Sequence, residues 1–571
     1  MNSIDPSSSL SSSLVAGAMR QLENMSAEQS APQPAAMPGG DVVTLSPQAA
    51  STVTASLGYQ LGDKLSSSLS DGTLVTVGRR QDIIQGETPT YTMTFMDGSG
   101  SSFSFDFQGD VSVRRYGDGY AVYDAVNNVT DVYGVDGSKN RFSGLLEDAD
   151  AGAETVYVNL GGGTLDTGDG NNLVFAYGGG AVINGGSGDD TILFSGDVSD
   201  VTVNGGEGND TVIARGTLSN ATLDLGEGDN LVDVAQMSGG KLSGGDGNND
   251  VRIHNVSDGA QIRLGDGSNR LDVYGLYDTS SVTLGNGGNT VGVESLKGGA
   301  RLELGGGNNK LDIYGIYGTS SVTLGDGSNR IDVYELENDA ALTAGNGDNT
   351  VNIYELRSQS SFTLGNGNNS VNAYGSSGSA AMNFGDGSNT MQMYESLGSS
   401  GIRFGNGSNA MRIYEMEERS SVGFGNGNNM LVAYQMLDDT SADFGDGNNI
   451  FVAGSVFDNA SVRFGDGNNL LFAMSVSGNV SITGGKGNNL FLIETLSSGT
   501  VSGGEGTTIS RFDEPGNATG QANAITAWNE AVSGLVAPGG GSLRFEDLHS
   551  TIYNWDAFSS IFSSAYWWNR G

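Results

Sequence analysis

The chain has no cysteine among its 571 residues and only eight prolines. Without cysteine it can form no disulfide, no thiolate metal site and no cysteine nucleophile. Basic residues are also scarce, because 26 Lys and Arg stand against 66 Asp and Glu and leave a formal net charge of −40. A surface this acidic repels phosphate backbones, so we expect no nucleic acid partner.

Long apolar runs are missing as well. No run of 18 apolar residues occurs, so the sequence predicts no transmembrane segment. The first basic residue is Arg20, and no apolar stretch of seven residues follows a charged start, so we expect no cleavable signal peptide. The two histidines, His254 and His549, lie in no nucleophile or zinc motif. The sequence therefore predicts a protein that is not an enzyme, with residues 41–160 left open as the place for an activity.

Glycine is abundant instead, with 92 residues that do not recur at every third position. They fall in eighteen tracts, of which seventeen have the form G-x-G-x-[ND] and the last ends in Thr instead. Between residues 265 and 485 the period is 20 residues without an insertion, which requires that each repeat stack on the next. The sequence predicts an all-β fold, a parallel β-solenoid of about 18 coils. The tracts begin at Gly168, Gly186, Gly206, Gly226 and Gly245, then at every twentieth residue from Gly265 to Gly485, and last at Gly504.

Each coil reads as a glycine-rich turn, a strand, a variable turn and a second strand. In residues 264–283 and just beyond, the alternation places Leu271, Val273, Val282 and Leu284 inside. The asparagine that ends each tract falls at a tight turn, where we expect a positive φ and amide hydrogen bonds to the coils above and below. This predicted structural ladder includes Asn269, Asn289, Asn309 and Asn329.

Composition divides the chain into four parts. Residues 1–40 are rich in Ser, Ala and Gln and read as a flexible leader that could carry an export signal. Residues 41–160 hold short alternating runs and are predicted to form a β-rich N-terminal cap. Residues 161–510 are the solenoid, and residues 511–571 are predicted to form a C-terminal cap, a docking segment or a secretion segment.

Two early tracts, GGSGDDTIL at 185–193 and GGEGNDTVI at 205–213, match the pattern G-G-x-G-x-D-x-U-x at every specified position. They resemble the calcium-binding nonapeptide of RTX proteins, which Gram-negative bacteria secrete. The resemblance implies that carbonyls of the glycine turn and the carboxylates of Asp190 and Asp210 are calcium ligands. From Gly226 onward the sixth position is Asn or, in the last tract, Thr, so calcium is expected at the early coils only.

A column of tyrosines is predicted on an outward face. Such a stripe could grip a glycan, a particle surface or a partner protein, or its rings could stack and stiffen the coils. The sequence leaves both interpretations open. The column comprises Tyr274, Tyr314, Tyr334, Tyr354, Tyr374, Tyr394, Tyr414 and Tyr434.

The outward face becomes apolar near the C-terminal end. Positions that hold Arg270 and Asp272 in an early coil become aliphatic or aromatic in later coils. We expect the aromatic segments within 520–570 to fold back as a helical cap that covers this face and blocks the open sheet edge, and a docking face for another molecule is the alternative. The face comprises Met430, Val432, Ile450, Val452, Leu470, Phe472, Leu490 and Leu492.

Export without a signal peptide leaves two routes open, type I export read from the C-terminus and type III or flagellar export read from the N-terminus. The expected location is the extracellular space or cell surface of a Gram-negative bacterium. The favoured function is a structural or adhesive protein that binds itself or cell-surface and matrix components. The alternatives are an exported effector or toxin, and a rod that binds glycan or calcium.

Overall fold

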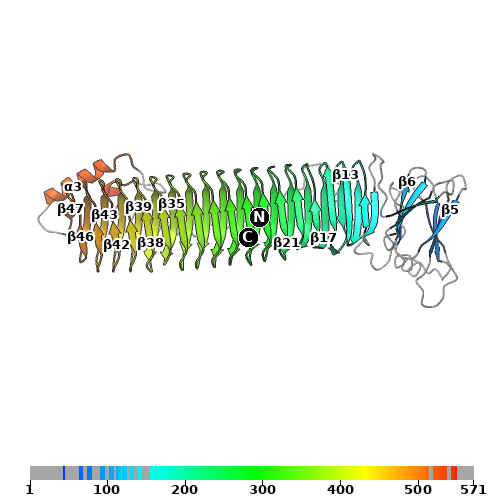
Figure 1. The fold of residues 1–571 in the computed structure, drawn as a ribbon. Helices are drawn as coiled ribbons and strands as arrows, with labels where there is room; N and C mark the ends of the chain where they lie inside the picture. The colour runs from blue at the N-terminus through cyan, green and yellow to red at the C-terminus, as the bar shows by residue number, and fades with distance from the viewer. Residues whose placement is uncertain are drawn as a thin grey trace. The chain divides into compact units, whose positions relative to one another are not determined.

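The computed structural model describes the strands between residues 43 and 160, and then residues 163–513, 518–535 and 542–548. The predicted leader, residues 1–40, lies outside the described residues. The chain forms two compact units: residues 1–274 with 280–282, and residues 275–279 with 283–571. Figure 1 shows the described elements in chain order.

The first unit begins with two antiparallel sheets, whose strands follow the alternating runs that predicted them. One sheet has the order β2-β3-β4-β5 and the other the order β1-β6-β7-β8-β9. Whether they act as a cap stays a prediction. The strands are β1 (Val43–Leu45), β2 (Lys64–Ser68), β3 (Leu74–Arg79), β4 (Tyr91–Met96), β5 (Ser102–Phe107), β6 (Val111–Tyr116), β7 (Gly119–Asp124), β8 (Val129–Tyr133) and β9 (Lys139–Ser143).

The rest of the first unit is built from parallel strands in two sheets. In the long-strand sheet, strands pair in the order β10-β12-β14-β15-β17-β19-β21, and in the short-strand sheet in the order β11-β13-β16-β18-β20-β22. The long strands are β10 (Thr155–Leu160), β12 (Leu173–Gly178), β14 (Thr191–Phe194), β15 (Val198–Ser199), β17 (Thr211–Ser219), β19 (Leu231–Ser238) and β21 (Asp250–Ser257). The short strands are β11 (Gly163–Asp166), β13 (Ala181–Ser187), β16 (Thr202–Glu207), β18 (Thr222–Asp224), β20 (Lys241–Gly244) and β22 (Gln261–Leu264).

The second unit repeats this arrangement, and β23 (Arg270–Leu276) and β24 (Ser281–Leu284) contribute residues to both units. Its long strands are β25 (Thr290–Leu296), β27 (Lys310–Tyr317), β29 (Arg330–Glu337), β31 (Thr350–Leu356), β33 (Ser370–Ser376), β35 (Thr390–Gly398), β37 (Ala410–Glu417), β39 (Met430–Met436), β41 (Ile450–Val456), β43 (Leu470–Val476), β45 (Leu490–Leu496) and β47 (Thr508–Arg511). Its short strands are β26 (Arg301–Leu304), β28 (Ser321–Leu324), β30 (Ala341–Ala344), β32 (Ser361–Leu364), β34 (Ala381–Phe384), β36 (Gly401–Phe404), β38 (Ser421–Phe424), β40 (Ser441–Asp443), β42 (Ser461–Arg463), β44 (Ser481–Thr483) and β46 (Thr500–Ser502).

The fold is thus the predicted parallel β-solenoid, of about 17 turns. Strand pairs keep an offset of 20 residues through most of the repeat, as in Val333 opposite Ile353. The helix α3 (Ala518–Ala531) follows the last strand, and a single helical turn lies at residues 545–548. The predicted helical cap is therefore one short helix together with residues 542–548, and residues 549–571 lie outside the described part of the chain.

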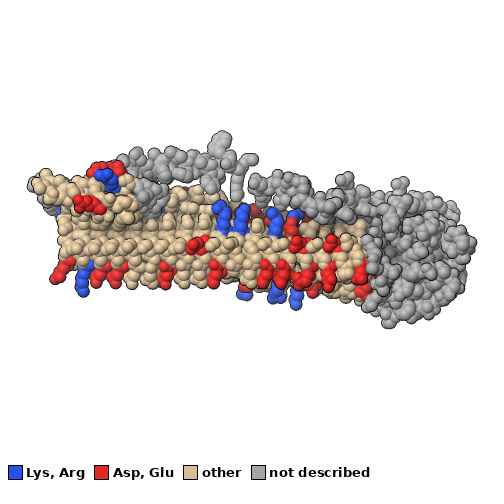
Figure 2. Space-filling view, turned by 90° about the horizontal axis from the view of Figure 1, so that it is seen from above, with Lys and Arg blue, Asp and Glu red and all other residues tan. Residues whose placement is uncertain are grey.

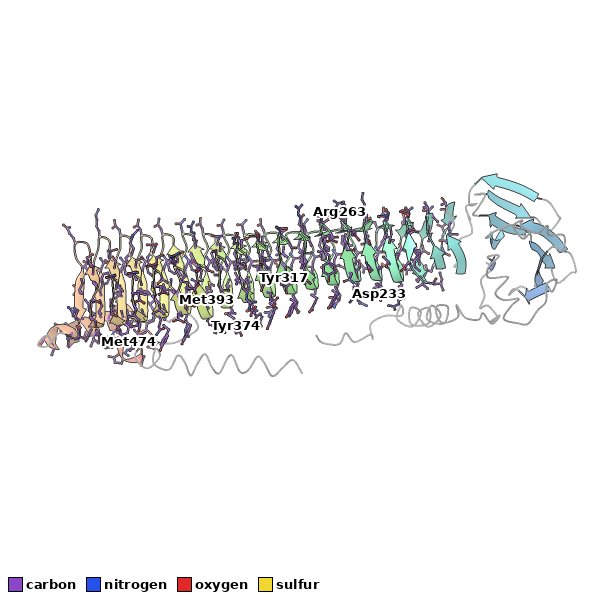
Figure 3. The ribbon with its side chains drawn as sticks, turned by 90° about the horizontal axis from the view of Figure 1, so that it is seen from below. Asp233, Arg263, Tyr317, Tyr374, Met393 and Met474 are labelled. Atoms are coloured by element: carbon purple, nitrogen blue, oxygen red, sulfur yellow. The ribbon has the colours of Figure 1, made fainter. Side chains whose placement is uncertain are left out.

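The core of each coil lies between its two sheets. Leu271, Val273, Val282 and Leu284 are 0–3% exposed, as the alternation predicted. Met393 lies inside while Tyr374 points outward (Figure 3). Like residues stack in columns, and the rings of Phe404, Phe424 and Phe444 lie 5.0 Å apart between successive centroids. Because each core side chain meets its equivalent in the next coil, an insertion in one coil would disturb every column.

Candidate functional site

The asparagines that end the glycine tracts form a buried ladder along each unit. We number the tract from the residue before its first repeat glycine, so that Asn369 is its sixth position. Asn369 Nδ2 donates to Gly365 O at 3.2 Å and Gly367 O at 2.9 Å in its own turn, and to Asn389 Oδ1 at 2.8 Å. Its Oδ1 accepts from the backbone N and the Nδ2 of Asn349. Both polar atoms of the amide therefore have partners, and they connect consecutive coils.

The same contacts recur at Asn269, Asn289, Asn309 and Asn329, which are at most 2% exposed. The expected positive φ is wrong, because none of these asparagines is among the described residues with that conformation. Among the described residues other than glycine, positive φ occurs instead at the opposite turn, for example at Asp278, Ser358 and Asp458. The sixth position favours asparagine because its buried amide can both donate to the turn carbonyls and accept from the neighbouring coil.

Two outer ladders, at the third and fifth tract positions, were not anticipated. At the third position the backbone N of Asn346 donates to Asp326 Oδ1 at 2.9 Å, and that of Asn366 donates to Asn346 Oδ1 at 3.1 Å. At the fifth position the backbone N of Asn368 donates to Asp348 Oδ1 at 2.6 Å. Asp and Asn serve equally well here because one short-chain oxygen acceptor suffices. The predominance of short acceptor side chains at these positions was the available signal.

Asp190 and Asp210 replace asparagine at the sixth position of the two tracts that resemble RTX repeats. Asp190 Oδ1 accepts from the backbone N of Asn172 at 2.8 Å, and Asp210 Oδ1 accepts from that of Asp190 at 2.9 Å. The two residues are 1% and 0% exposed, and the Oδ2 atom of each has no hydrogen-bond partner among the described residues. Each Oδ2 thus takes the place of an amide Nδ2 without being able to donate a proton when ionised.

Burial raises the pKa of Asp190 to about 7, and the nearby Asp210 adds to the effect. Burial likewise raises the pKa of Asp210 to about 6, with the charge of Asp189 contributing. A carboxylate without a donor in a buried site favours either a proton or a bound cation. Only glycine fits at positions 185 and 205, because a Cβ atom there would lie 2.3 and 2.2 Å from the respective Oδ2 atoms.

The oxygen atoms available at these two coils are of the kind that calcium binds. Each coil offers one buried carboxylate oxygen without a partner, beside a turn rich in backbone carbonyls, and calcium prefers such oxygen ligands. No group of three or more His, Cys, Asp or Glu side chains that could hold a metal occurs in the described residues, so carbonyls or water would have to complete the shell. Calcium at Asp190 and Asp210 stays a prediction.

The replacement Asp190→Asn with Asp210→Asn should stabilise the first unit in calcium-free buffer at pH 8. When folding raises the pKa of a carboxyl group, the protein loses stability as the pH rises from the unfolded pKa, 3.8, to the folded pKa, here about 6 to 7. Above that range the full loss of stability is present. Thermal unfolding at pH 4 and pH 8 checks the prediction. The wild-type protein should melt lower at pH 8 by more than the double variant does, and equal pH responses would contradict it.

The tyrosine column forms a stack of rings on the outward face of the long-strand sheet. Centroids of Tyr314, Tyr334, Tyr354 and Tyr374 are 4.8–5.1 Å apart from ring to ring. Tyr394 follows with a tilted ring, and Tyr414 stacks on Tyr434. Since the ring faces contact one another, this geometry favours the stiffening interpretation over stacking on a ligand. Tyr274 is 50% exposed and stacks on His254. A partner for this column stays a prediction.

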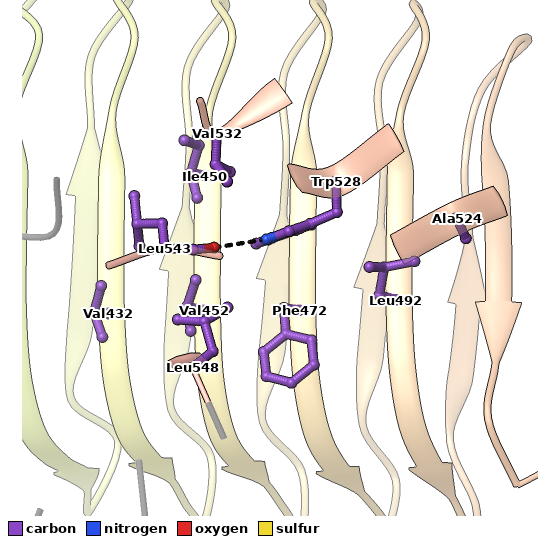
Figure 4. Packing of buried hydrophobic residues seen from close by; sticks show 10 residues of the cluster. All are labelled: Val432, Ile450, Val452, Phe472, Leu492, Ala524, Trp528, Val532, Leu543 and Leu548. Carbon is purple, nitrogen blue, oxygen red and sulfur yellow. Dashed lines mark hydrogen bonds between the residues drawn. The ribbon is translucent and has the colours of Figure 1, made fainter. Parts of the chain in front are cut away.

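The apolar outward face near the C-terminal end lies beneath α3 and residues 542–548. Trp528 of α3 is fully buried, with its ring centroid 6.0 Å from that of Phe472. Its Nε1 donates to Leu543 O at 2.8 Å (Figure 4). The cluster buries Val432, Ile450, Val452, Phe472 and Leu492, and Met430, Leu470 and Leu490 pack at its border partly exposed.

The helix α3 and residues 542–548 do not block the sheet edge as expected. The helix lies over the face of β39, β41, β43 and β45 and contacts the last strand through Gln521 Nε2, which donates to Arg511 O at 2.9 Å. Ile509, in that last strand, is 40% exposed. The helix is amphipathic, and an apolar sheet face offers it more burial than a narrow edge does.

A second buried column carries hydroxyl groups without partners. Ser320, Ser360, Ser420 and Thr440 are fully buried, and their hydroxyl oxygens have no hydrogen-bond partner among the described residues. Other coils hold alanine at the same position, for example Ala340 and Ala380. We therefore expect the hydroxyls to destabilise the coils slightly, because a buried polar group without a partner loses its hydration.

Ser360→Ala should raise the stability of the second unit by about 1 kcal/mol, because it removes such a hydroxyl where the neighbouring coils already accept a methyl group. Ser361→Ala is the matched control, since Ser361 is only half-buried on the outer face. Chemical denaturation of both variants checks this. A loss of stability in Ser360→Ala would mean that the hydroxyl has a partner, such as an internal water.

None of the family models, curated proteins or solved structures compared with the chain matches it. Within the described residues, no helix combines the length and apolarity that crossing a membrane requires. The fold therefore defines the class of protein, a parallel β-solenoid with turns rich in Asn and Asp. Figure 2 shows mostly acidic side chains along one border of the coils, a group of basic ones at part of the other border and a few acidic ones between.

Proposed function

We propose that the protein is a non-enzymatic structural scaffold, exported to the surface or extracellular matrix of a Gram-negative bacterium, where it contacts itself or matrix components. The observation that carries this proposal is the set of three side-chain ladders joining consecutive coils, seen at Asp326, Asp348 and Asn369. Regular coils with polar side chains committed to neighbouring coils support a mechanical role, because few such groups are left to act on a substrate.

A second part of the proposal is calcium binding at the two early coils that resemble RTX repeats. The partnerless Oδ2 atoms of Asp190 and Asp210 support it. In that role the two carboxylates and nearby turn carbonyls hold the ion, which takes the place of the hydrogen-bond donor that the asparagine amide supplies elsewhere in the column.

Fractionation of a bacterium that expresses the chain, followed by electron microscopy of the purified protein, tests the scaffold proposal. We expect the protein outside the cell and discrete or assembled solenoids on the grid, with no turnover of surface glycans or lipids. Retention in the cytoplasm, or a catalytic activity that maps to residues 41–160, would contradict it. The effector alternative predicts transfer into a host cell in the same assay.

A further inference from the structure

The second unit ends in a coil whose two strands each have a neighbour on one side. β46 and β47 stand last in the strand orders of their sheets, paired with β44 and β45. Four of their seven residues are exposed, and Thr508 and Ile509 of β47 are exposed where the paired residues of β45, Leu490 and Phe491, are half-buried and buried. A parallel sheet that stops in this way leaves a template for another strand.

The exposed end includes a residue of the core. Ile509 pairs with Phe491, which in turn pairs with Leu471, so it belongs to an interior column. Phe491 and Leu471 are fully buried, but Ile509 is 40% exposed. In the described residues only Tyr274, Ile509 and Leu535 are large hydrophobic side chains exposed to this extent. The end of the core is therefore open at Ile509.

The ladders change at this end in a way that opposes a further coil of the same kind. Asn489 Nδ2 donates to Thr507 Oγ1 at 2.9 Å, and threonine has no amide with which to extend the sixth-position column. At the third position the backbone N of Lys486 donates to Asp466 Oδ1, and the lysine side chain has no acceptor for the next coil. Head-to-tail addition of another copy is thus disfavoured.

Two copies of the chain repel each other less at the last coil than at the rest of their surfaces. The protein carries a formal net charge of −40, so most pairs of surfaces on two copies repel. Residues 495–513 contain only three charged side chains, and Arg511 and Asp513 pair at 3.1 Å, leaving Glu505. Two such ends can approach with little repulsion.

We infer that the C-terminal end of the second unit binds the same end of a second copy, in a closed two-fold dimer that covers Ile509 on both. A two-fold contact uses one surface twice and needs no continuation of the ladders, so it stops at two copies. Edge strands of the two copies then lie antiparallel across the axis. The inference is independent of export and of calcium, since it uses residues of the last coil alone.

Light scattering coupled to size-exclusion chromatography tests this on the full chain. We expect a species of twice the 58.8 kDa chain mass, which Ile509→Asp converts to monomer with a dimer dissociation constant raised at least about 30-fold. Leu535→Asp is the control: Leu535 is 44% exposed after α3, away from the last coil, and its replacement should leave the dimer intact. Thr508→Lys, at an exposed position of β47, should also give monomer and serves if Ile509→Asp disturbs the fold.

Three results would overturn the inference. A monomeric wild-type protein is the first, and if removal of residues 549–571 then produces dimers, that segment is the occupant of the end. Dimers that survive both Ile509→Asp and Thr508→Lys are the second, because they place the contact elsewhere. Open-ended oligomers that grow with concentration are the third, because they contradict a closed contact.

Discussion

Gly367→Ala should destabilise the second unit by at least about 3 kcal/mol. A Cβ atom at this fourth tract position would lie 2.0 Å from Gly347 O and 2.3 Å from its carbonyl carbon in the preceding coil. Both atoms belong to backbone that is fixed by the flanking ladders, so the coils would have to move apart. The loss should appear as a lowered denaturant midpoint and as faster amide exchange in β31 and β33.

The matched control is Gly423→Ala, on the outer side of the short-strand sheet. There the nearest atom to an added Cβ is Ile402 O at 3.9 Å, an ordinary contact distance. Its neighbours in the column, Arg403 and Asp443, carry full side chains. Gly423→Ala should therefore change stability by less than about 1 kcal/mol, and a loss equal to that of Gly367→Ala would show that the close approach between turns is not the cause.

Asn369→Ala should be nearly as costly, at roughly 3–5 kcal/mol. The change removes three hydrogen bonds that the Asn369 amide donates and two that its oxygen accepts from Asn349. It also leaves buried groups of the neighbouring coils without partners, which is the larger part of the cost. Local hydrogen exchange is the suitable measurement, because a solenoid can open one segment at a time.

Two further variants distinguish the effect of the Asn369 amide from the effect of any substitution in the same turn. Asn368→Ser, at the exposed fifth position, should cost little, since Ser328 and Ser388 occupy the same column. Asn369→Asp keeps the acceptor and replaces the donor, so it should be destabilised at pH 8 and recover at pH 4 as the carboxyl group takes up a proton. If the stability of Asn369→Asp did not depend on pH, the hydrogen bonds that Asn369 donates would not be what stabilises the column.

The period of the sequence predicted most of the fold. A 20-residue repeat without insertions admits only stacked coils, and alternation then placed Val273 inside and Tyr274 outside. The same columns indicated that Val432 and Phe472 need a cover, which α3 provides. These successes share a cause, because a pattern repeated many times averages out the ambiguity of any one strand.

The details of the turns could not be read in this way. The amide hydrogen bond between Asn269 and the neighbouring coil was predicted and is confirmed, but the predicted positive φ is wrong, and the bonds from its side chain to the turn carbonyls were not predicted. The outer ladders at Asp326 and Asp348 depend on the spacing between coils, which the sequence does not state. The path of the C-terminal helix over the sheet face rather than the edge likewise depends on tertiary packing of Trp528.

The central claim is that an amide ladder joins the coils and that a cation is needed at Asp190 and Asp210 alone. Hydrogen exchange of the full chain, with calcium and with a chelator, tests it most directly. The account predicts that removing calcium increases exchange around residues 185–215 and leaves the coils from Asn269 to Asn489 unchanged. Increased exchange throughout residues 265–489 would contradict the account, because it would show that the asparagine coils also depend on a metal ion.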